Sequence, residues 1–273
     1  MSIIYYLDFP CAVKEQIRPG RMLRLLYARE RANEEMNRAR KTKPDARAED
    51  VRVELSLKDA DGTSNLVATT AADIERQYAE LDRLSHHCMD CRARIEAQSF
   101  GCRGRIDFPF TLKAETLLMQ RVRASGGDPT ASMLANYFEN NGISGNRAGD
   151  MRNLHGVFFE STMPLVRRLT DGRKISSNQV FELFFQTGQI GPKHARFLLG
   201  MFDLLAPNLP IDRPLQSLPN LFVVEREDSG MVVQRIGLNL VAGDEERCTR
   251  QLENYFGGLL LASELGHDLW VKI

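Results

Sequence analysis

The sequence carries no excess of charge, no long apolar run and few cysteines, and each shortage excludes a class of protein. Lysine plus arginine number 36 and aspartate plus glutamate also number 36, so the formal net charge is zero. Proteins that coat nucleic acid or anionic membranes usually carry a clear basic excess, so such binding would need a local patch. No stretch approaches the roughly 18 consecutive apolar residues of a spanning helix, so we expect no membrane partner.

Features of secretion are also lacking. Residues 1–8 contain no lysine or arginine and end at Asp8, which is unlike a secretory signal. Five of the 273 residues are cysteine, and their clustering does not resemble a disulfide framework in a chain this long. We therefore expect a cytoplasmic protein with reduced thiols.

The common catalytic motifs are missing as well. No GxxxxGK[ST], GxGxxG, GxSxG or HExxH is present, so phosphate-loop, dinucleotide, hydrolase-elbow and zincin chemistry lack their signatures. A zinc deaminase needs an H-x-E pair before its cysteines, and no histidine precedes His86. These absences favour a non-catalytic role, although they leave the question of an enzyme open.

Hydrophobic periodicity predicts an α+β fold that is mixed and mainly helical, with short strands at both ends of the chain. Strands are expected at 3–7, 51–57, 66–70, 105–110, 221–225, 231–241 and 267–273. Helices are expected at 21–41, 71–84, 112–124, 130–139, 161–169, 178–186, 192–205 and 245–263. Residues 140–150 are expected to form a long loop, and 177–205 a buried αα-hairpin.

Three parts are expected within one globular unit. Residues 1–125 form an N-terminal part that carries the cysteine cluster, and 126–214 form a helical part. A proline-rich connector at 207–219 leads into a C-terminal hairpin, helix and strand at 215–273.

Three cysteines form the most informative feature, with the spacing Cys88-x2-Cys91-x10-Cys102. Two thiolates three residues apart can bind one ion from a tight turn, as in a zinc knuckle. Glycines on both sides of Cys102 would let the chain bend round the metal. These features predict a structural zinc ion in a Cys-rich metal-binding loop, with ordinary buried thiols or an iron–sulfur cluster as alternatives. Cys248 falls in an apolar helical stripe and is expected in the core.

A closed zinc site needs a fourth ligand, for which Cys11, His86 and His87 are the candidates. His87 adjoins Cys88, and adjacent residues seldom both reach one tetrahedral ion, so His86 is the better histidine. Cys11 follows an Asp-Phe-Pro segment that is echoed at 107–109, and the echo indicates two similar strands. An antiparallel pair with Phe9 opposite Arg105 would bring Cys11 towards the cluster. Cys11 is therefore the predicted fourth ligand, whereas His86 needs no long-range contact.

The leading functional hypothesis is a zinc-stabilised interaction or regulatory protein with an unknown protein partner. The first alternative is a metal- or thiol-dependent enzyme, in which the three cysteines leave an open position for water. The second alternative is a nucleic-acid-binding protein that uses the helix at 21–43, which contains eight basic and three acidic residues. Such binding would weaken steeply with added salt.

Overall fold

The structure is a computed structural model that describes residues 2–58, 64–89, 91–95, 99–107, 110–124, 127–154, 157–185, 188–204, 222–226, 232–236 and 247–272. The α+β class is confirmed. Contacts divide the chain into two compact units: unit 1 comprises Met1–Phe9 and Arg92–Ile273, and unit 2 comprises Pro10–Cys91. These units do not follow the boundaries of the three predicted parts, because strand pairing joins the first residues of the chain to its far end.

Unit 2 consists of helices and one β-hairpin. Its elements are α1 (Ala12–Gln16), α2 (Pro19–Thr42), β2 (Arg52–Lys58), β3 (Ser64–Thr70), α3 (Ala71–Asp82) and the 3-10 turn η1 (Ser85–Cys88). α2 has Pro19 in its first turn, where a missing N–H is tolerated. Thr70 caps α3, because its Oγ1 accepts a hydrogen bond from the Asp73 backbone N–H at 3.1 Å.

The hairpin of unit 2 follows the predicted alternation of apolar and polar residues. β2 and β3 pair antiparallel over their whole length. Val53 and Leu55 are buried, and the residues that alternate with them, Arg52 and Glu54, are exposed. One face of β2 therefore meets the core. The turn expected at 61–62 lies outside the described residues.

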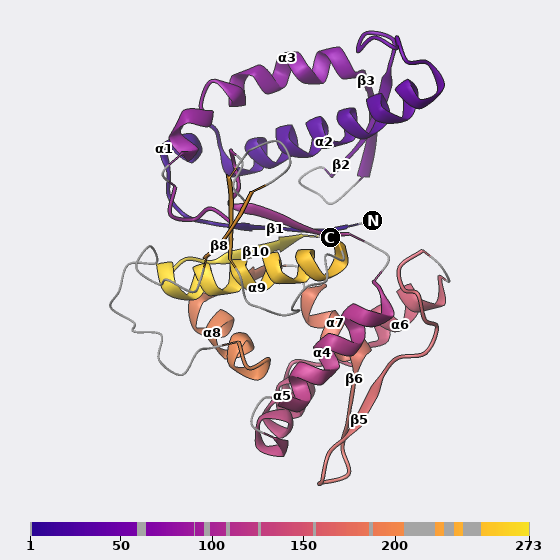
Figure 1. Ribbon diagram of the computed structural model, residues 1–273, viewed down its shortest axis with the longest axis vertical. Helices are drawn as coiled ribbons and strands as arrows, with labels where there is room; N and C mark the ends of the chain where they lie inside the picture. The colour runs from indigo at the N-terminus through magenta and orange to yellow at the C-terminus, as the bar shows by residue number, and fades with distance from the viewer. Residues whose placement is uncertain are drawn as a thin grey trace. The chain divides into compact units, whose positions relative to one another are not determined.

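Small side chains dominate the core of unit 2. The buried cluster comprises Ala28, Ala32, Met36, Ala46, Val51, Val53, Leu55, Ala71 and Ile74. Alanine at successive turns of α2 lets its neighbours approach closely, and α2 and α3 lie side by side in Figure 1.

Unit 1 is built round a four-stranded antiparallel sheet with the strand order β4-β1-β10-β7. These strands are β1 (Ser2–Leu7), β4 (Arg103–Asp107), β7 (Gly188–Ile190) and β10 (Leu269–Lys272). Two separate hairpins are β5 (Val166–Arg168) with β6 (Lys174–Ser176), and β8 (Phe222–Arg226) with β9 (Val232–Ile236). The helices are α4 (Leu112–Ala124), α5 (Asp128–Asn140), α6 (Asn146–Asn153), α7 (Ser177–Phe184), α8 (Pro192–Met201) and α9 (Arg247–Leu265).

β1 pairs antiparallel with β4, as predicted, but in a different register. Ile4 lies opposite Arg105, so the predicted pairing of Phe9 with Arg105 is wrong by five residues. The observed register sets Ile3 opposite Ile106, and both side chains are fully buried. Because side chains alternate between faces, burial of one apolar face decides the register, which the Asp-Phe-Pro echo could not do.

α9 packs along one face of this sheet (Figure 1). The buried ring of Tyr5 meets that of Tyr255 edge-on, with centroids 5.4 Å apart. Two glycines make room for it: a Cβ on Gly104 would overlap the Tyr5 ring, and one on Gly258 would come within 3.3 Å of it. Cys248 of α9 is buried, which confirms its expected place in the core.

The described residues of 177–205 contribute many side chains to the core, but they do not form the predicted αα-hairpin. α7 and α8 are separated by β7, which joins the sheet beside β10. The expected burial of Leu198, Leu199 and Phe202 is confirmed, and α8 packs against α9. α8 therefore serves the core, and its apolar face is not available to a DNA groove.

The prediction of a long loop at 140–150 is wrong for residues 146–150, which belong to α6. Gly145 precedes this helix with a φ of 82°, a left-handed conformation that suits glycine. The polar composition of α6 hid the helix, because its inward side presents only Ala148 and Arg152 to the core.

The helix expected at 161–169 is also wrong. Residues 166–168 form β5, which pairs with β6 across a turn at Gly172, whose φ is 86°. The Leu165 N–H is bonded to the Ser177 side-chain oxygen at 2.9 Å, so the segment satisfies its backbone outside a helix.

The C-terminal hairpin expected within 221–241 is present as β8 and β9, whereas its turn and the connector at 207–219 lie outside the described residues. Among the residues that the structure describes, no helix is long and apolar enough to span a membrane.

Candidate functional site

The predicted metal ligands belong to different units. Cys11, Cys88 and Cys91 lie in unit 2, and Cys102 lies in unit 1. All four are partly exposed thiols that form no disulfide. Partial exposure is compatible with reactivity or metal binding, in contrast to the buried Cys248.

Cys88 and Cys91 lie on a tight turn. Cys88 is the last residue of η1, and the Cys91 N–H donates to the Cys88 carbonyl at 3.4 Å. A turn closed in this way keeps the two residues near each other on one short stretch of chain. This is the local backbone arrangement that a knuckle requires.

Cys11 stands next to the same part of unit 2. It is the N-cap residue of α1, and α1 packs against η1. Its side chain makes no capping hydrogen bond, so the sulfur has no role in holding the helix end. Segments far apart in the sequence thus bring Cys11 and Cys88 onto contacting elements.

His86 offers a second candidate on η1. Its Nδ1 lies 3.0 Å from the Arg83 carbonyl oxygen, which can only accept, so Nδ1 carries the proton and Nε2 is the unprotonated nitrogen of the neutral ring. Zinc-binding histidines usually donate their other ring N–H to a carbonyl or carboxylate in this manner. The geometry of this side chain therefore suits a ligand as well as Cys11 does.

Cys102 lies just before β4 in unit 1. Its carbonyl accepts a hydrogen bond from the Leu7 N–H at 2.9 Å, which continues the pairing of β1 with β4. Two residues earlier Phe100 has a φ of 61°, which is uncommon for a bulky residue. The sheet therefore holds the backbone of Cys102, and a left-handed residue shapes the approach to it.

Within the described ranges of the chain, no group of three or more histidine, cysteine, aspartate or glutamate side chains is arranged to hold a metal ion. The zinc site remains a prediction from the cysteine spacing.

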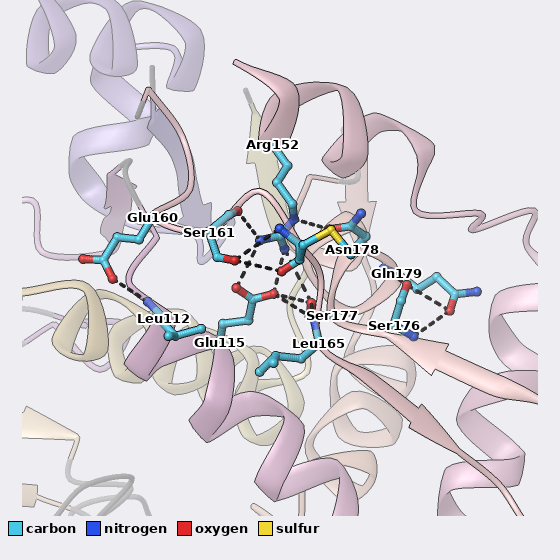
Figure 2. Close-up of polar contacts among 11 residues, drawn as sticks. Leu112, Glu115, Arg152, Glu160, Ser161, Leu165, Ser176, Ser177, Asn178 and Gln179 are labelled. Carbon is cyan, nitrogen blue, oxygen red and sulfur yellow. Dashed lines mark hydrogen bonds and ion pairs between the residues drawn. The ribbon is translucent and has the colours of Figure 1, made fainter. Parts of the chain in front are cut away.

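A buried polar cluster in unit 1 was not foreseen from the sequence. Glu115 of α4 and Arg152 of α6 form an ion pair whose side chains are each 1% exposed. Arg152 Nη2 donates to Glu115 Oε1 at 2.7 Å, and Nη1 donates to Oε2 at 3.1 Å. Figure 2 shows this two-pronged contact at the centre of the cluster. Paired contacts of this kind are among the strongest hydrogen bonds in proteins.

The other donors of Arg152 are also used. Its Nε donates to Asn178 Oδ1 at 2.9 Å, and its Nη1 donates to the Ser161 carbonyl at 2.9 Å (Figure 2). The guanidinium lies over the Phe159 ring, 4.1 Å from its centroid. One side chain thereby joins α6, α7 and the segment that precedes β5.

Glu115 is equally well supplied with donors. The Ser177 hydroxyl donates to its Oε1, and the Leu165 N–H reaches the same oxygen at 3.4 Å. Ser177 is itself buried, so no described path leads from solvent to this hydroxyl. The cluster therefore connects secondary-structure elements, and its serine is not positioned as an accessible nucleophile.

One signal in the sequence could have revealed the cluster. Glu115 occupies the first position of the stripe Glu115, Leu118, Met119 and Val122 on α4, at the helical spacing of a buried face. A carboxylate among apolar core positions needs a buried partner. The identity of that partner, Arg152, could come only from the tertiary structure.

On α2, the basic helix of the nucleic-acid hypothesis, several arginines form ion pairs with nearby carboxylates. Along α2, Arg31 lies 2.7 Å from Glu34 and Arg38 lies 3.0 Å from Glu35. Arg29 reaches Asp82 of α3 at 3.6 Å. These pairs reduce the positive potential along the middle of the helix.

Comparison with models of protein families, with curated proteins and with solved structures gave no match.

Proposed function

We propose that the protein is a non-catalytic interaction or regulatory protein that a structural zinc ion stabilises. The proposed ligands are Cys88, Cys91 and Cys102, with Cys11 as the fourth. The observation that supports the proposal best is the turn between Cys88 and Cys91, together with the packing of the helix after Cys11 against η1, which ends at Cys88. Because all five cysteines are thiols, a reducing compartment such as the cytoplasm is part of the proposal.

Metal binding and local folding would be coupled. Zinc binds thiolates, so the ion displaces protons from cysteine and draws the sulfur atoms together. Cysteine ligands that do not hold a fixed arrangement without the metal would therefore become ordered when zinc binds. On this proposal the ion stabilises the cysteine segment and prepares a surface for a partner.

Metal analysis of the purified protein tests the site directly. Protein prepared under reducing, zinc-replete conditions should contain about one zinc ion per chain, as a closed site of four protein ligands requires. Cys88→Ser and Cys91→Ser should lose the metal, whereas Cys248→Ala, a change to a buried thiol of α9, should retain it. Protein without stoichiometric metal would exclude the site, and bound iron with visible absorbance would favour the iron–sulfur alternative.

The fourth ligand distinguishes a closed structural site from an open one. Zinc affinity should fall in Cys11→Ser if Cys11 completes the site, and in His86→Gln if the histidine does. Loss in neither variant would leave a position for water and would support the metal-dependent enzyme instead.

A further inference from the structure

A hollow lined by arginines lies at the start of α2, within unit 2. It has a volume of about 450 Å³, and its lining residues are Gln16, Ile17, Arg18, Gly20, Arg21 and Arg24. This volume lies within the range of roughly 300–1,000 Å³ that is usual for small-molecule sites.

The positive charge of this hollow is only partly neutralised. Arg21 forms an ion pair with Glu80 of α3. The side chains of Arg18 and Arg24 form no ion pair or hydrogen bond in the described parts of the chain. Two guanidinium groups therefore remain available to a ligand, each with a planar set of N–H donors that fits phosphate oxygens.

The spacing of the arginines directs them to one place. Arg21 and Arg24 lie three residues apart on α2 and share a face, and Arg18 is the residue that precedes the helix. They span roughly 9 Å along the helix axis at about 1.5 Å per residue. The positive end of the long α2 dipole adds to the same region.

Gly20 keeps the hollow open among these long side chains. A Cβ built on Gly20 would meet no heavy atom within 4 Å, so open space lies beside its backbone. Its φ is not left-handed, so backbone conformation does not require glycine here. A close approach of a ligand to the main chain is therefore sterically allowed at this position.

We propose that this hollow binds a compact phosphate-bearing small molecule through Arg18 and Arg24, with the polyphosphate group as the recognised part. The hollow gathers three arginines at the start of α2, whereas Arg31 and Arg38 further along the helix pair with carboxylates on the same helix. An extended nucleic acid needs phosphate contacts along a track, whereas this arrangement concentrates them at one point. The observations favour a small ligand over a polymer.

Titration calorimetry with inorganic pyrophosphate at low ionic strength tests the proposal. The wild type should bind, and the Arg18→Gln/Arg24→Gln variant should bind about tenfold to a hundredfold more weakly, since each lost contact involves a charged donor. The matched control is Arg38→Gln/Arg40→Gln, which removes two charges from exposed positions at the other end of α2. It should change the affinity less than about twofold, because long-range charge is screened.

A second variant separates the shape of the hollow from its charge. Gly20→Leu fills the open space without altering any charge, and it should also weaken pyrophosphate binding. Circular dichroism must show unchanged helix content in each variant. Absence of binding by the wild type, or equal weakening in the control, would overturn the proposal. Tighter binding of a single-stranded oligonucleotide, weakened by both double variants, would overturn it in favour of a nucleic-acid partner along the whole helix.

Discussion

The ion pair inside unit 1 and the ion pairs along α2 of unit 2 use the same chemistry in opposite surroundings. Glu115 and Arg152 are each 1% exposed, whereas the side chain of Arg38 is 73% exposed and that of its partner Glu35 is 19% exposed. Exposed pairs contribute about 0.2–1 kcal/mol, but removal of one partner of a buried pair costs about 3–5 kcal/mol. Surroundings, more than the number of charges, decide what each arginine contributes to stability.

The two units can be followed separately in solution. Trp270, the one tryptophan of the chain, lies on β10 of unit 1. Its fluorescence therefore reports on unit 1, whereas far-ultraviolet circular dichroism reports on the helices of both units. Chemical denaturation with both signals assigns each change in stability to a unit.

The largest effect is expected from Arg152→Met. The substitution leaves Glu115 buried without its charge partner, so the free energy of unfolding should fall by about 3–5 kcal/mol in the Trp270 signal. Glu115→Leu/Arg152→Met should recover most of this loss, because no buried charge remains. A single-variant loss below about 1 kcal/mol would show that the pair is not buried in solution.

Two glycines provide the next comparison. Gly104→Ala should lower the free energy of unfolding by about 1–3 kcal/mol, because the added Cβ overlaps the Tyr5 ring. Gly20→Ala in unit 2 meets only open space and should be neutral or stabilise α2 by up to about 1 kcal/mol. Equal effects of the two substitutions, measured by fluorescence and circular dichroism, would contradict the packing described for Tyr5.

Helix caps should have similar effects in the two units. Ser176 begins α7 in a capping box with Gln179, and Thr70 caps α3. Ser176→Ala and Thr70→Ala should each cost about 1 kcal/mol, the former in the fluorescence signal and the latter in circular dichroism. A Thr70→Ala loss that appears in the Trp270 fluorescence would argue against the division of the chain.

The Thr70 cap also predicts a dependence on pH. The hydrogen bond from the Thr70 hydroxyl holds the pKa of the Asp73 carboxyl below its ordinary value. A lowered pKa in the folded state means that this stabilisation is present above the unfolded pKa and is lost as pH falls through the folded pKa. In acid titrations the Thr70→Ala variant should therefore show a weaker loss of stability than the wild type.

The smallest effect is expected from Glu35→Gln on α2. It removes the charge partner of Arg38, whose side chain is 73% exposed, and a longer contact with Arg31 at 3.4 Å, so the free energy of unfolding should change by about 0.5 kcal/mol or less. Added salt should reduce even this difference, because exposed charges are screened. A change comparable with that of Arg152→Met would abolish the contrast between the two units.

Elements with strong local signals were predicted from the sequence, and those that depend on distant partners were not. The alternation around Val53 predicted β2, and the proline at 129 marked the start of α5. α6 was not predicted, because its inward side is short and its main buried side chain is an arginine. The same arginine defines the buried cluster, so the missed helix and the missed cluster have one cause.

The sequence by itself determined the local features: the α+β class, the periodic helices and strands, and the cysteine spacing that predicts zinc. Each of these depends on residues that are neighbours along the chain, where propensity and periodicity act. The tertiary structure alone decided the register of β1, the partner of Glu115 and the assignment of Cys102 to a different unit from Cys11, Cys88 and Cys91. These depend on burial between segments far apart in the chain, and a linear pattern carries no information on which distant surfaces will meet.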